Sequence, residues 1–266
     1  NHPFTEGFPV TALREISVLL APSHESIVSV KEMLVGDGID KVFMVMEYFD
    51  CDLKDALQKS STLSQAELKG ILQQILSGTA HMHESQYIHR DMKPSNILVQ
   101  FAKNRIALAD FGLARKFHTP AISMTLPVVT LWYRAPELLF GESKYGPAID
   151  MWSIGCIFGE LILSGGHLDD EDSNAILQGQ GELAQIDEIF SLMGGPSEET
   201  WPGFDRLPNA NLLRWKSNEE PTFPNRFKVG SFSSSSTFLD ANGYRLLESM
   251  LSLDPKQRIS ASSALQ

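Results

Sequence analysis

One long amphipathic helix, predicted from residue 64 onward, limits the folds open to this sequence more than any other segment. It begins with Ser64 and Glu67, a capping box in which a hydroxyl and a carboxylate satisfy free backbone donors at a helix start. A stripe at i, i+3, i+4 and i+7 then runs over four turns. Its members are Leu68, Ile71, Leu72, Ile75, Leu76, Thr79 and Met82. Because a stripe of this length must be buried, we expect this helix to lie in a domain core.

Shorter patterns surround that helix. Residues 27–35 and 41–48 are rich in Val, Ile, Phe and Met and flank a Gly-Asp-Gly turn, which predicts a β-hairpin. Residues 11–20 place leucine and isoleucine on one helical face, and a helical, apolar pattern returns after residue 150. Strands in a small front section and helices in a larger rear section indicate an α+β protein of two lobes, joined near Asp50.

Charge and cysteine content exclude several classes of protein. The 266 residues include 22 Lys and Arg against 33 Asp and Glu, a net charge of -11 without a basic stripe, which argues against direct nucleic-acid binding. Cys51 and Cys156 have neither zinc spacing nor the density of a disulfide framework, so we expect a reducing, intracellular compartment. Apolar runs at 42–46 and 154–163 are shorter than the roughly 18 residues of a membrane span, and a signal peptide is not visible.

A short polar loop after the predicted helix carries the clearest candidate chemistry. It groups the carboxylate of Asp91, the amine of Lys93 and the carboxamide of Asn96, and a second predicted strand at 106–109 ends in Asp110. Carboxylate and amide oxygens are ligands that Mg²⁺ prefers. A carboxylate can also accept a hydroxyl proton, and a lysine can neutralise phosphoryl charge. These residues together predict phosphoryl transfer.

Three ordered motifs extend this prediction to a family. They are His89-Arg90-Asp91 with Asn96, Asp110-Phe111-Gly112, and Ala135-Pro136-Glu137. Each alone could be an ordinary loop, but in this order they resemble the catalytic loop, magnesium loop and activation segment of eukaryotic protein kinases. Four further segments are similar to cyclin-dependent kinases, closest to the PITSLRE-type branch: 6–15, 128–137, 150–157 and 196–204. The resemblance implies a bilobal kinase fold, with an incomplete N-lobe sheet in 1–49 and the mostly helical C-lobe in 50–266.

The resemblance also implies roles for the residues of the polar loop. Asp91 would orient and deprotonate the substrate hydroxyl, and Asn96 and Asp110 would hold Mg²⁺ against the phosphates of ATP. Lys93, two residues after the aspartate, is similar to the serine/threonine-kinase form that touches the γ-phosphate. Thr130 is counted with the catalytic residues. A Ser/Thr kinase is therefore expected rather than a Tyr kinase.

Nucleotide contacts are implied in the linker and in the two strands after the polar loop. Met46 would be the gatekeeper, the backbone of Glu47 and Phe49 would bind adenine, and Asp52 would face the ribose. The remaining contacts would come from Ser95, Leu98, Ala109 and Asp110. By composition alone, Met46 and Leu98 are equally suited to an ordinary hydrophobic core.

Regulation by a cyclin is implied at the start of the chain. Glu15 would pair with a strand lysine once a cyclin packs against the helix at 10–20. Thr125 stands at the position of the activating phosphothreonine, whose added charge would bind the family's three phosphate-gripping cations. These cations are Arg14, Arg90 and Arg115. The alternatives are a solvated surface glutamate at 15 and an ordinary loop threonine at 125.

Two stretches depart from the family pattern. Neither the Gly-rich loop nor the Ala-x-Lys strand precedes residue 6, so we expect these 266 residues to be poorly active by themselves. A truncated form of a complete kinase is favoured over a natural pseudokinase. Residues 165–186 form an acidic, atypical insert where the family has a short Pro-Phe-Pro-Gly segment. It is either a lineage-specific surface loop or a mis-spliced piece.

Two functions follow from these patterns. The first is a cyclin-activated, ATP- and Mg²⁺-dependent Ser/Thr kinase of cell-cycle or transcription and splicing control, located in the nucleus or cytoplasm. Val129 would select substrates with Pro after the phosphorylated Ser or Thr. The alternative is a non-catalytic, kinase-like module that binds a cyclin through residues 10–20. A Gly-x-Gly-x-x-Gly with Ala-x-Lys upstream would favour the first.

Overall fold

The computed structural model describes residues 23–35, 42–59, 63–117, 131–164, 175–211, 220–230 and 239–266. The helix predicted at 11–20 and the turn at 36–38 lie outside these ranges. The strands are β1 (Val30–Val35), β2 (Val42–Met46), β3 (Cys51–Asp52), β4 (Tyr87–Ile88), β5 (Ile97–Gln100), β6 (Arg105–Leu108) and β7 (Arg115–Lys116). Four short 3₁₀ helices are η1 (Pro94–Asn96), η2 (Phe101–Lys103), η3 (Leu131–Tyr133) and η4 (Phe204–Arg206).

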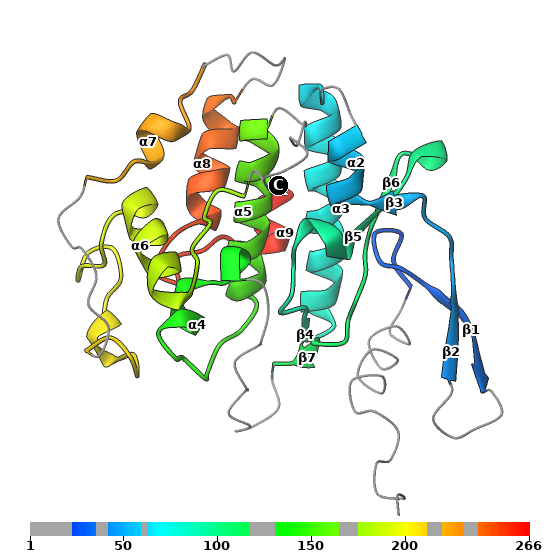
Figure 1. Cartoon of the computed structure of the whole chain (residues 1–266), viewed down its shortest axis with the longest axis horizontal. Helices are drawn as coiled ribbons and strands as arrows, with labels where there is room; N and C mark the ends of the chain where they lie inside the picture. The colour runs from blue at the N-terminus through cyan, green and yellow to red at the C-terminus, as the bar shows by residue number, and fades with distance from the viewer. Residues whose placement is uncertain are drawn as a thin grey trace, which may run out of the picture.

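The α-helices hold more of the described residues than the strands do. They are α2 (Leu53–Lys59), α3 (Gln65–Glu84), α4 (Pro136–Leu139), α5 (Ala148–Ser164), α6 (Glu182–Met193), α7 (Phe223–Arg226), α8 (Ala241–Met250) and α9 (Ala261–Ala264). Figure 1 shows α3 and α5 side by side in the middle of this helical body, with α8 next to α5. The helix α6 starts inside the stretch expected to be an atypical insert, whose residues 165–174 lie outside the described ranges.

The long helix predicted from residue 64 is confirmed as α3. Ser64 accepts a hydrogen bond from the Glu67 amide, and the Glu67 carboxylate accepts one from the Ser64 amide at 2.8 Å, as the capping box requires. The predicted stripe is buried apart from the half-buried Ile71. The neighbouring α5 is apolar on nearly all sides, and Trp152, Ile154 and Leu161 are fully buried in it. A helix hydrophobic all round belongs in the centre of a core.

The strands of the described residues form three small sheets. The described strands β1 and β2 pair antiparallel with each other, β5 lies between β3 and β6, and β4 pairs with β7. The first strand was predicted too long at its start. Residues 26–28 pair with the second sheet, because the Leu108 amide donates to the Ser26 carbonyl and the Val28 amide to the Leu108 carbonyl, both at 2.9 Å. The regular strand β1 therefore begins only at Val30, and β2 ends at Met46 instead of residue 48.

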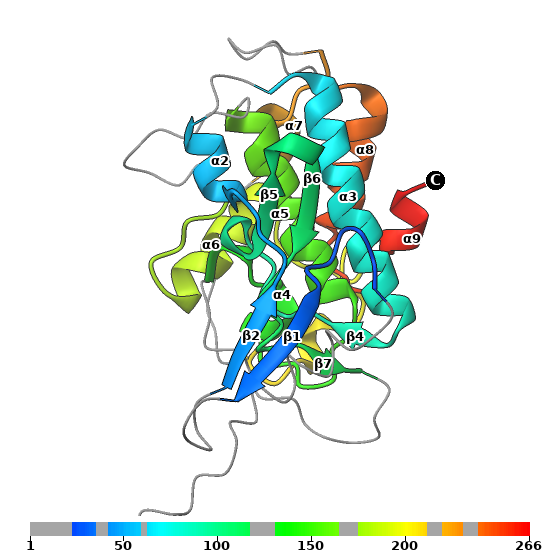
Figure 2. The ribbon, with the colours of Figure 1, turned by 90° about the vertical axis from the view of Figure 1, so that its right-hand side faces the viewer.

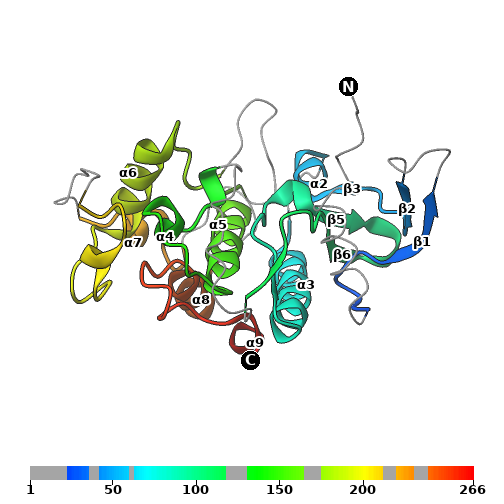
Figure 3. The same ribbon diagram turned by 90° about the horizontal axis from the view of Figure 1, so that it is seen from below.

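Two views at right angles to the first show that β1 and β2 project from one end of the helical body (Figures 2 and 3). Several of their apolar side chains are exposed: Met33, Leu34, Phe43, Val45 and Met46. The predicted α+β class is confirmed by these helices and antiparallel sheets, whereas the domain boundary at 49/50 stays a prediction. In the described parts of the chain, no helix combines the length and apolarity needed to cross a bilayer.

Candidate active site

The polar loop between β4 and β5 holds the Asp91 carboxylate in a defined position. Lys93 Nζ lies 2.9 Å from Asp91 Oδ2, and Asn96 Nδ2 donates to the same oxygen at 3.0 Å and to the Asp91 carbonyl at 2.8 Å. Three predicted site residues are therefore brought together around one carboxylate. The Asp91 side chain is 9% exposed, which leaves it accessible while its two partners keep it from rotating.

Asp150, at the start of α5, fixes the backbone of this loop through hydrogen bonds. Its carboxylate accepts hydrogen bonds from the amides of His89 (2.8 Å) and Arg90 (2.9 Å), and His83 Nε2 lies 2.9 Å from it. Burial alone would raise the pKa of Asp150, but the hydrogen bond and charge of His83, with the loop amide, hold its pKa below the usual value. Arg90 has a φ of 74°, a strained conformation for a non-glycine residue, and the buried Asp150 holds it there.

Asn96 and Asp110 lie at adjoining ends of β5 and β6. Ile97 pairs with Leu108, and the Ala109 amide donates to the Asn96 carbonyl at 2.9 Å. Asp110 is exposed and has a φ of 59°. Asn96 donates through Nδ2, which leaves its amide oxygen and the Asp110 carboxylate as the predicted magnesium ligands. One amide and one carboxylate fit a magnesium ion that takes its other ligands from water and phosphate. The described residues hold no cluster of three or more His, Cys, Asp or Glu suited to a metal.

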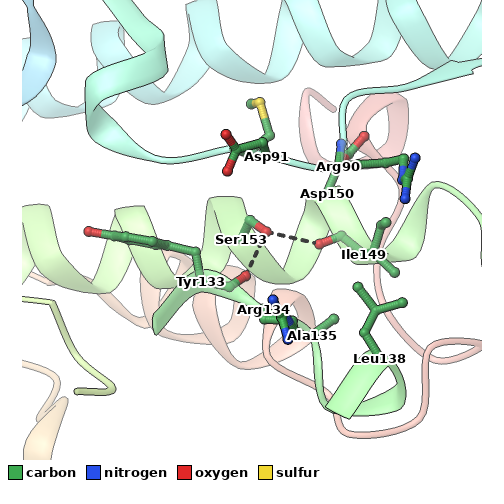
Figure 4. A pocket seen from close by; sticks show the side chains of 10 residues that line it. Arg90, Asp91, Tyr133, Arg134, Ala135, Leu138, Ile149, Asp150 and Ser153 are labelled. Carbon is green, nitrogen blue, oxygen red and sulfur yellow. Dashed lines mark hydrogen bonds between the residues drawn. The ribbon is translucent and has the colours of Figure 1, made fainter. Parts of the chain in front are cut away.

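A pocket separates this loop from the segment that leads into α4. Figure 4 shows Arg90 and Asp91 on one side, Tyr133, Arg134 and Ala135 on the other, and Ser153 of α5 between them. Ser153 Oγ donates to the Tyr133 carbonyl at 2.7 Å and to the Ile149 carbonyl at 3.1 Å, which fixes the far wall of the pocket (Figure 4).

The predicted nucleotide contacts are distributed along the linker and the second sheet. Met46 is 43% exposed at the end of β2, Ser95 is exposed in η1, and Leu98 and Ala109 are half-buried against the core. Asp52 lies opposite Leu98 in the ladder between β3 and β5, which places the proposed ribose and purine positions side by side. Asp52 Oδ1 also accepts from the Asp55 amide at 2.8 Å, so one of its oxygens caps α2.

Two of the three predicted phosphate-binding cations are described. Burial raises the pKa of Tyr145 above its usual value, and the positive charges of Arg90 and Arg115 partly oppose this rise. The Arg90 guanidinium lies 5.6 Å from the centre of the Tyr145 ring. The other regulatory predictions and one catalytic prediction lie outside the described residues: Arg14, Glu15, Thr125 and Thr130.

Two interactions near this site were not predicted from the sequence. His83, which supports Asp150, lies four residues after Thr79 on the buried face of α3, so the helical period could have indicated it. Arg105 pairs with Glu47 of the linker through two nitrogens, and the sequence contains no motif that signals this pair. Glu137 and Arg258 form a buried ion pair, with Nη2 2.6 Å from Oε2.

Known proteins share the sequence pattern and the fold of this chain, and they confirm the predicted bilobal, kinase-like fold class. Residues 4–266 match the family model of the protein kinase domain. Cyclin-dependent kinase G-2 of Oryza sativa subsp. indica is 42% identical over 264 residues, which cover 98% of this chain and 35% of that protein. Cyclin-dependent kinase 11 of Dictyostelium discoideum is 40% identical over 262 residues, which cover 98% of this chain and 68% of that protein.

Among solved structures, a chain of the yeast RNA Pol II CTD kinase CTDK-1 complex is similar with a TM-score of 0.86 and 35% identity, covering 98% of this chain and 81% of that one. The chain spans about a third of the length of the rice relative, so the shared region is one part of a longer relative.

Proposed function

The chain belongs to the protein kinase domain family, and on this premise we propose that it transfers the γ-phosphate of ATP to Ser or Thr side chains of proteins. One observation carries the proposal. The Asp91 carboxylate is held by Lys93 and Asn96, and Asp91 lines a pocket between the polar loop and the segment that leads into α4. A fixed carboxylate beside a cation is suited to a reaction in which a hydroxyl attacks a phosphoryl group.

Each residue of the site has a distinct part in this reaction. Asp91 orients the substrate hydroxyl and accepts its proton, while Lys93 offsets the negative charge of the transferring group. Asn96 and Asp110 would hold the magnesium ion. When bound, ATP with Mg²⁺ supplies the phosphoryl group, and the protein contributes positioning and charge rather than covalent chemistry.

The test is the Asp91→Asn variant of the full-length protein. Asparagine keeps the size of the side chain but cannot accept the proton, so we expect phosphate transfer to fall by at least about 100-fold, the lower range for loss of a general base. ATP affinity should stay near the wild-type value, because Asp91 faces the substrate hydroxyl. Transfer is measured with a Ser/Thr-Pro peptide, and ATP binding by calorimetry.

Asp187→Asn is the matched control, because Asp187 is exposed on α6 and lies apart from the pocket residues. It should leave transfer unchanged. Turnover retained in Asp91→Asn would refute the catalytic role of Asp91. A wild-type protein that binds a cyclin but transfers no phosphate would favour the non-catalytic module instead.

Partner and substrate are proposed from the resemblance and from the names of the relatives. The two relatives described above are cyclin-dependent kinases, which supports a cyclin as the activating partner, bound through residues 10–20 with Glu15 on that helix. Val129 supports proline-directed substrates. Cell-cycle or transcription and splicing control, in the nucleus or cytoplasm, is proposed on the same grounds.

Activation is proposed to depend on phosphorylation of Thr125. The positive charges of Arg90 and Arg115 both act on Tyr145, and a phosphate adds about -1.5 to -2 charge that such cations can bind. We expect Thr125→Ala to lower the activity of the cyclin-bound protein at least several-fold, an effect typical of losing a charge-assisted contact. An assay with phosphorylated wild-type protein as reference measures this, and an unchanged rate would remove Thr125 from the mechanism.

A further inference from the structure

One guanidinium group joins three segments of the chain at the base of β6. Arg105 Nε donates to the Glu25 carbonyl at 2.6 Å, in the segment before β1. Its Nη1 and Nη2 bind the two carboxylate oxygens of Glu47 in the linker, at 2.5 and 2.9 Å. The same group lies over the Phe49 ring, 5.2 Å from its centre. Arg105 thus contacts both residues whose backbone is proposed to bind adenine.

The carboxylate of Glu47 is tied from a second side. Glu47 Oε1 also accepts from the Ser29 amide at 2.9 Å, and the Glu47 amide donates to the Ser29 carbonyl at 3.3 Å. The side chains of Arg105 and Glu47 are only 19% and 18% exposed. Burial alone would raise the pKa of Glu47, but the hydrogen bonds from Arg105 and Ser29 hold that pKa below its usual value. The pair is therefore ionised at neutral pH and partly shielded from water, unlike an ordinary surface ion pair.

The linker is also fastened to the hairpin of β5 and β6 further along. The Asp50 amide donates to the Val99 carbonyl at 2.9 Å, and Asp50 Oδ2 accepts from the Phe101 amide at 2.8 Å. Gln100 Nε2 donates to the Tyr48 carbonyl at 3.1 Å. These three bonds hold residues 48–50, and Arg105 holds the two residues on either side of Tyr48.

The hairpin is itself fixed to the core helix α3. The Ile106 amide donates to Gln74 Oε1 at 2.8 Å, and Gln74 Nε2 donates to the Asn104 carbonyl at 3.2 Å. Both of these hairpin residues are neighbours of Arg105. The guanidinium therefore connects the linker to a rigid part of the larger lobe, and a shift of Arg105 would have to break these bonds as well.

We propose that Arg105 is a positioning residue for nucleotide binding, which fixes the linker between the lobes so that the backbone of Glu47 and Phe49 faces adenine. This inference rests on the proposed kinase function, because it assumes that adenine binds along the linker. Arg105 acts through Glu47 and Phe49, and it does not itself touch the reacting phosphate.

The first measurement uses hydrogen–deuterium exchange of the nucleotide-free, full-length protein. Arg105→Gln should speed exchange of the linker amides at 47–50 about tenfold, the factor that corresponds to loss of one charge-assisted hydrogen bond. Lys103→Gln is the matched control, since Lys103 is an exposed cation two residues earlier on the same hairpin. It should leave linker exchange unchanged.

The second measurement separates binding from chemistry. In Arg105→Gln the Kd for Mg²⁺–ATP and the KM for ATP should both rise about tenfold, while kcat stays within about twofold, the pattern of a lost ground-state contact. Arg105→Lys should recover only part of the affinity, because lysine keeps the charge without the two-pronged geometry. If Arg105→Gln folds poorly, Glu47→Gln removes the same ion pair from the other side. The double variant Arg105→Gln/Glu47→Gln should bind ATP at least as tightly as whichever single variant has the lower affinity.

Each outcome has one meaning. A wild-type protein that fails to bind ATP would overturn the proposed function itself. A wild-type protein that binds ATP, together with an Arg105→Gln variant of unchanged exchange or unchanged ATP affinity, would overturn only the role of Arg105.

Discussion

Glu160 of α5 is an acidic side chain placed almost completely out of water. It is 2% exposed, and the Tyr133 hydroxyl donates to its Oε2 at 2.8 Å. Burial raises the pKa of Glu160 to about 7, against the smaller opposing effects of the Tyr133 hydrogen bond and the Lys54 charge. The pair connects the central helix to Tyr133 in the far wall of the pocket beside Asp91.

We expect Glu160 to make the protein less stable as pH rises from about 4.5 to about 7. In this window the unfolded chain has released the proton while the folded protein still holds it, so the free energy of unfolding falls with rising pH, by an amount on the order of 3 kcal/mol. Glu160→Gln should lack this slope, since glutamine cannot ionise but still accepts the Tyr133 hydroxyl. Urea unfolding of both proteins at pH 5, 6, 7 and 8 measures the difference.

Subtracting the free energy of unfolding of Glu160→Gln from that of the wild type at each pH removes the effect of other groups that titrate in this range. One such group is His24, whose pKa is lowered mainly by burial. Glu198→Gln, at an exposed position, is the control and should follow the wild-type curve. Parallel curves for the wild type and Glu160→Gln would show that Glu160 does not titrate in this window.

At the residue level, the sequence was informative where motifs have fixed spacing. Asp91, Lys93 and Asn96 were predicted as a group because they are five residues apart at most, and the structure brings them together. The contacts of Arg105 could not be predicted, because its partners are 58 and 80 residues away and depend on how the sheets pack. Long-range side-chain pairs leave no local pattern in one sequence.

At the scale of elements, α3 packs closely against the segment before β1. A Cβ atom built at Gly78 would lie 2.6 Å from the Ser26 carbonyl oxygen and 3.1 Å from Leu108 Cδ1. That carbonyl cannot easily move, because it accepts the Leu108 amide. Gly70 lies on the same helix, and a Cβ atom built there would have no neighbouring atom within 4 Å.

We therefore expect opposite effects from the same substitution at two positions of one helix. Gly78→Ala should destabilise the protein by about 1–3 kcal/mol, the typical cost of overpacking. Gly70→Ala should stabilise it by up to about 1 kcal/mol, because alanine favours the helix. Thermal unfolding measures both variants, and a Gly78→Ala protein as stable as the wild type would show that α3 and the 26–28 segment are not in close contact.

The elements themselves were predictable where local chemistry decides them. The start of α3 follows from the hydrogen bonds of Ser64 and Glu67, which are three residues apart, and was predicted correctly. The start of β1 was wrong because Ile27 and Val28 have the same apolar character as the strand that follows. They bridge to Leu108 instead, a pairing partner about 80 residues away. Periodicity shows which residues can form a strand but not with which partner they pair.

At the scale of the whole molecule, one buried ion pair connects regions far apart in sequence. Arg258 binds Glu137 of α4 through two nitrogens, both at 2.6 Å, across 121 residues. It also donates to the carbonyls of Ala148 and Leu253 and lies over the Trp152 ring, 5.0 Å from its centre. The side chains of Arg258 and Glu137 are 0% and 3% exposed. The helix α4, the start of the central helix α5 and the C-terminal region therefore all contact the Arg258 guanidinium.

Removing one partner of the Glu137–Arg258 pair should destabilise the protein more, for each residue changed, than replacing both partners together. Glu137→Gln leaves the Arg258 charge buried without its counterion, so we expect a loss of about 3–5 kcal/mol in the free energy of unfolding. Arg258→Met should cost a similar amount, since it strands the Glu137 carboxylate. The double variant Glu137→Leu/Arg258→Met should lose clearly less than the sum of these two, because no charge is left unpaired. It should not regain full wild-type stability, because the carbonyls of Ala148 and Leu253 lose their donor. Denaturant unfolding of the four proteins measures the interaction, and strictly additive losses would mean that the pair does not hold these regions together.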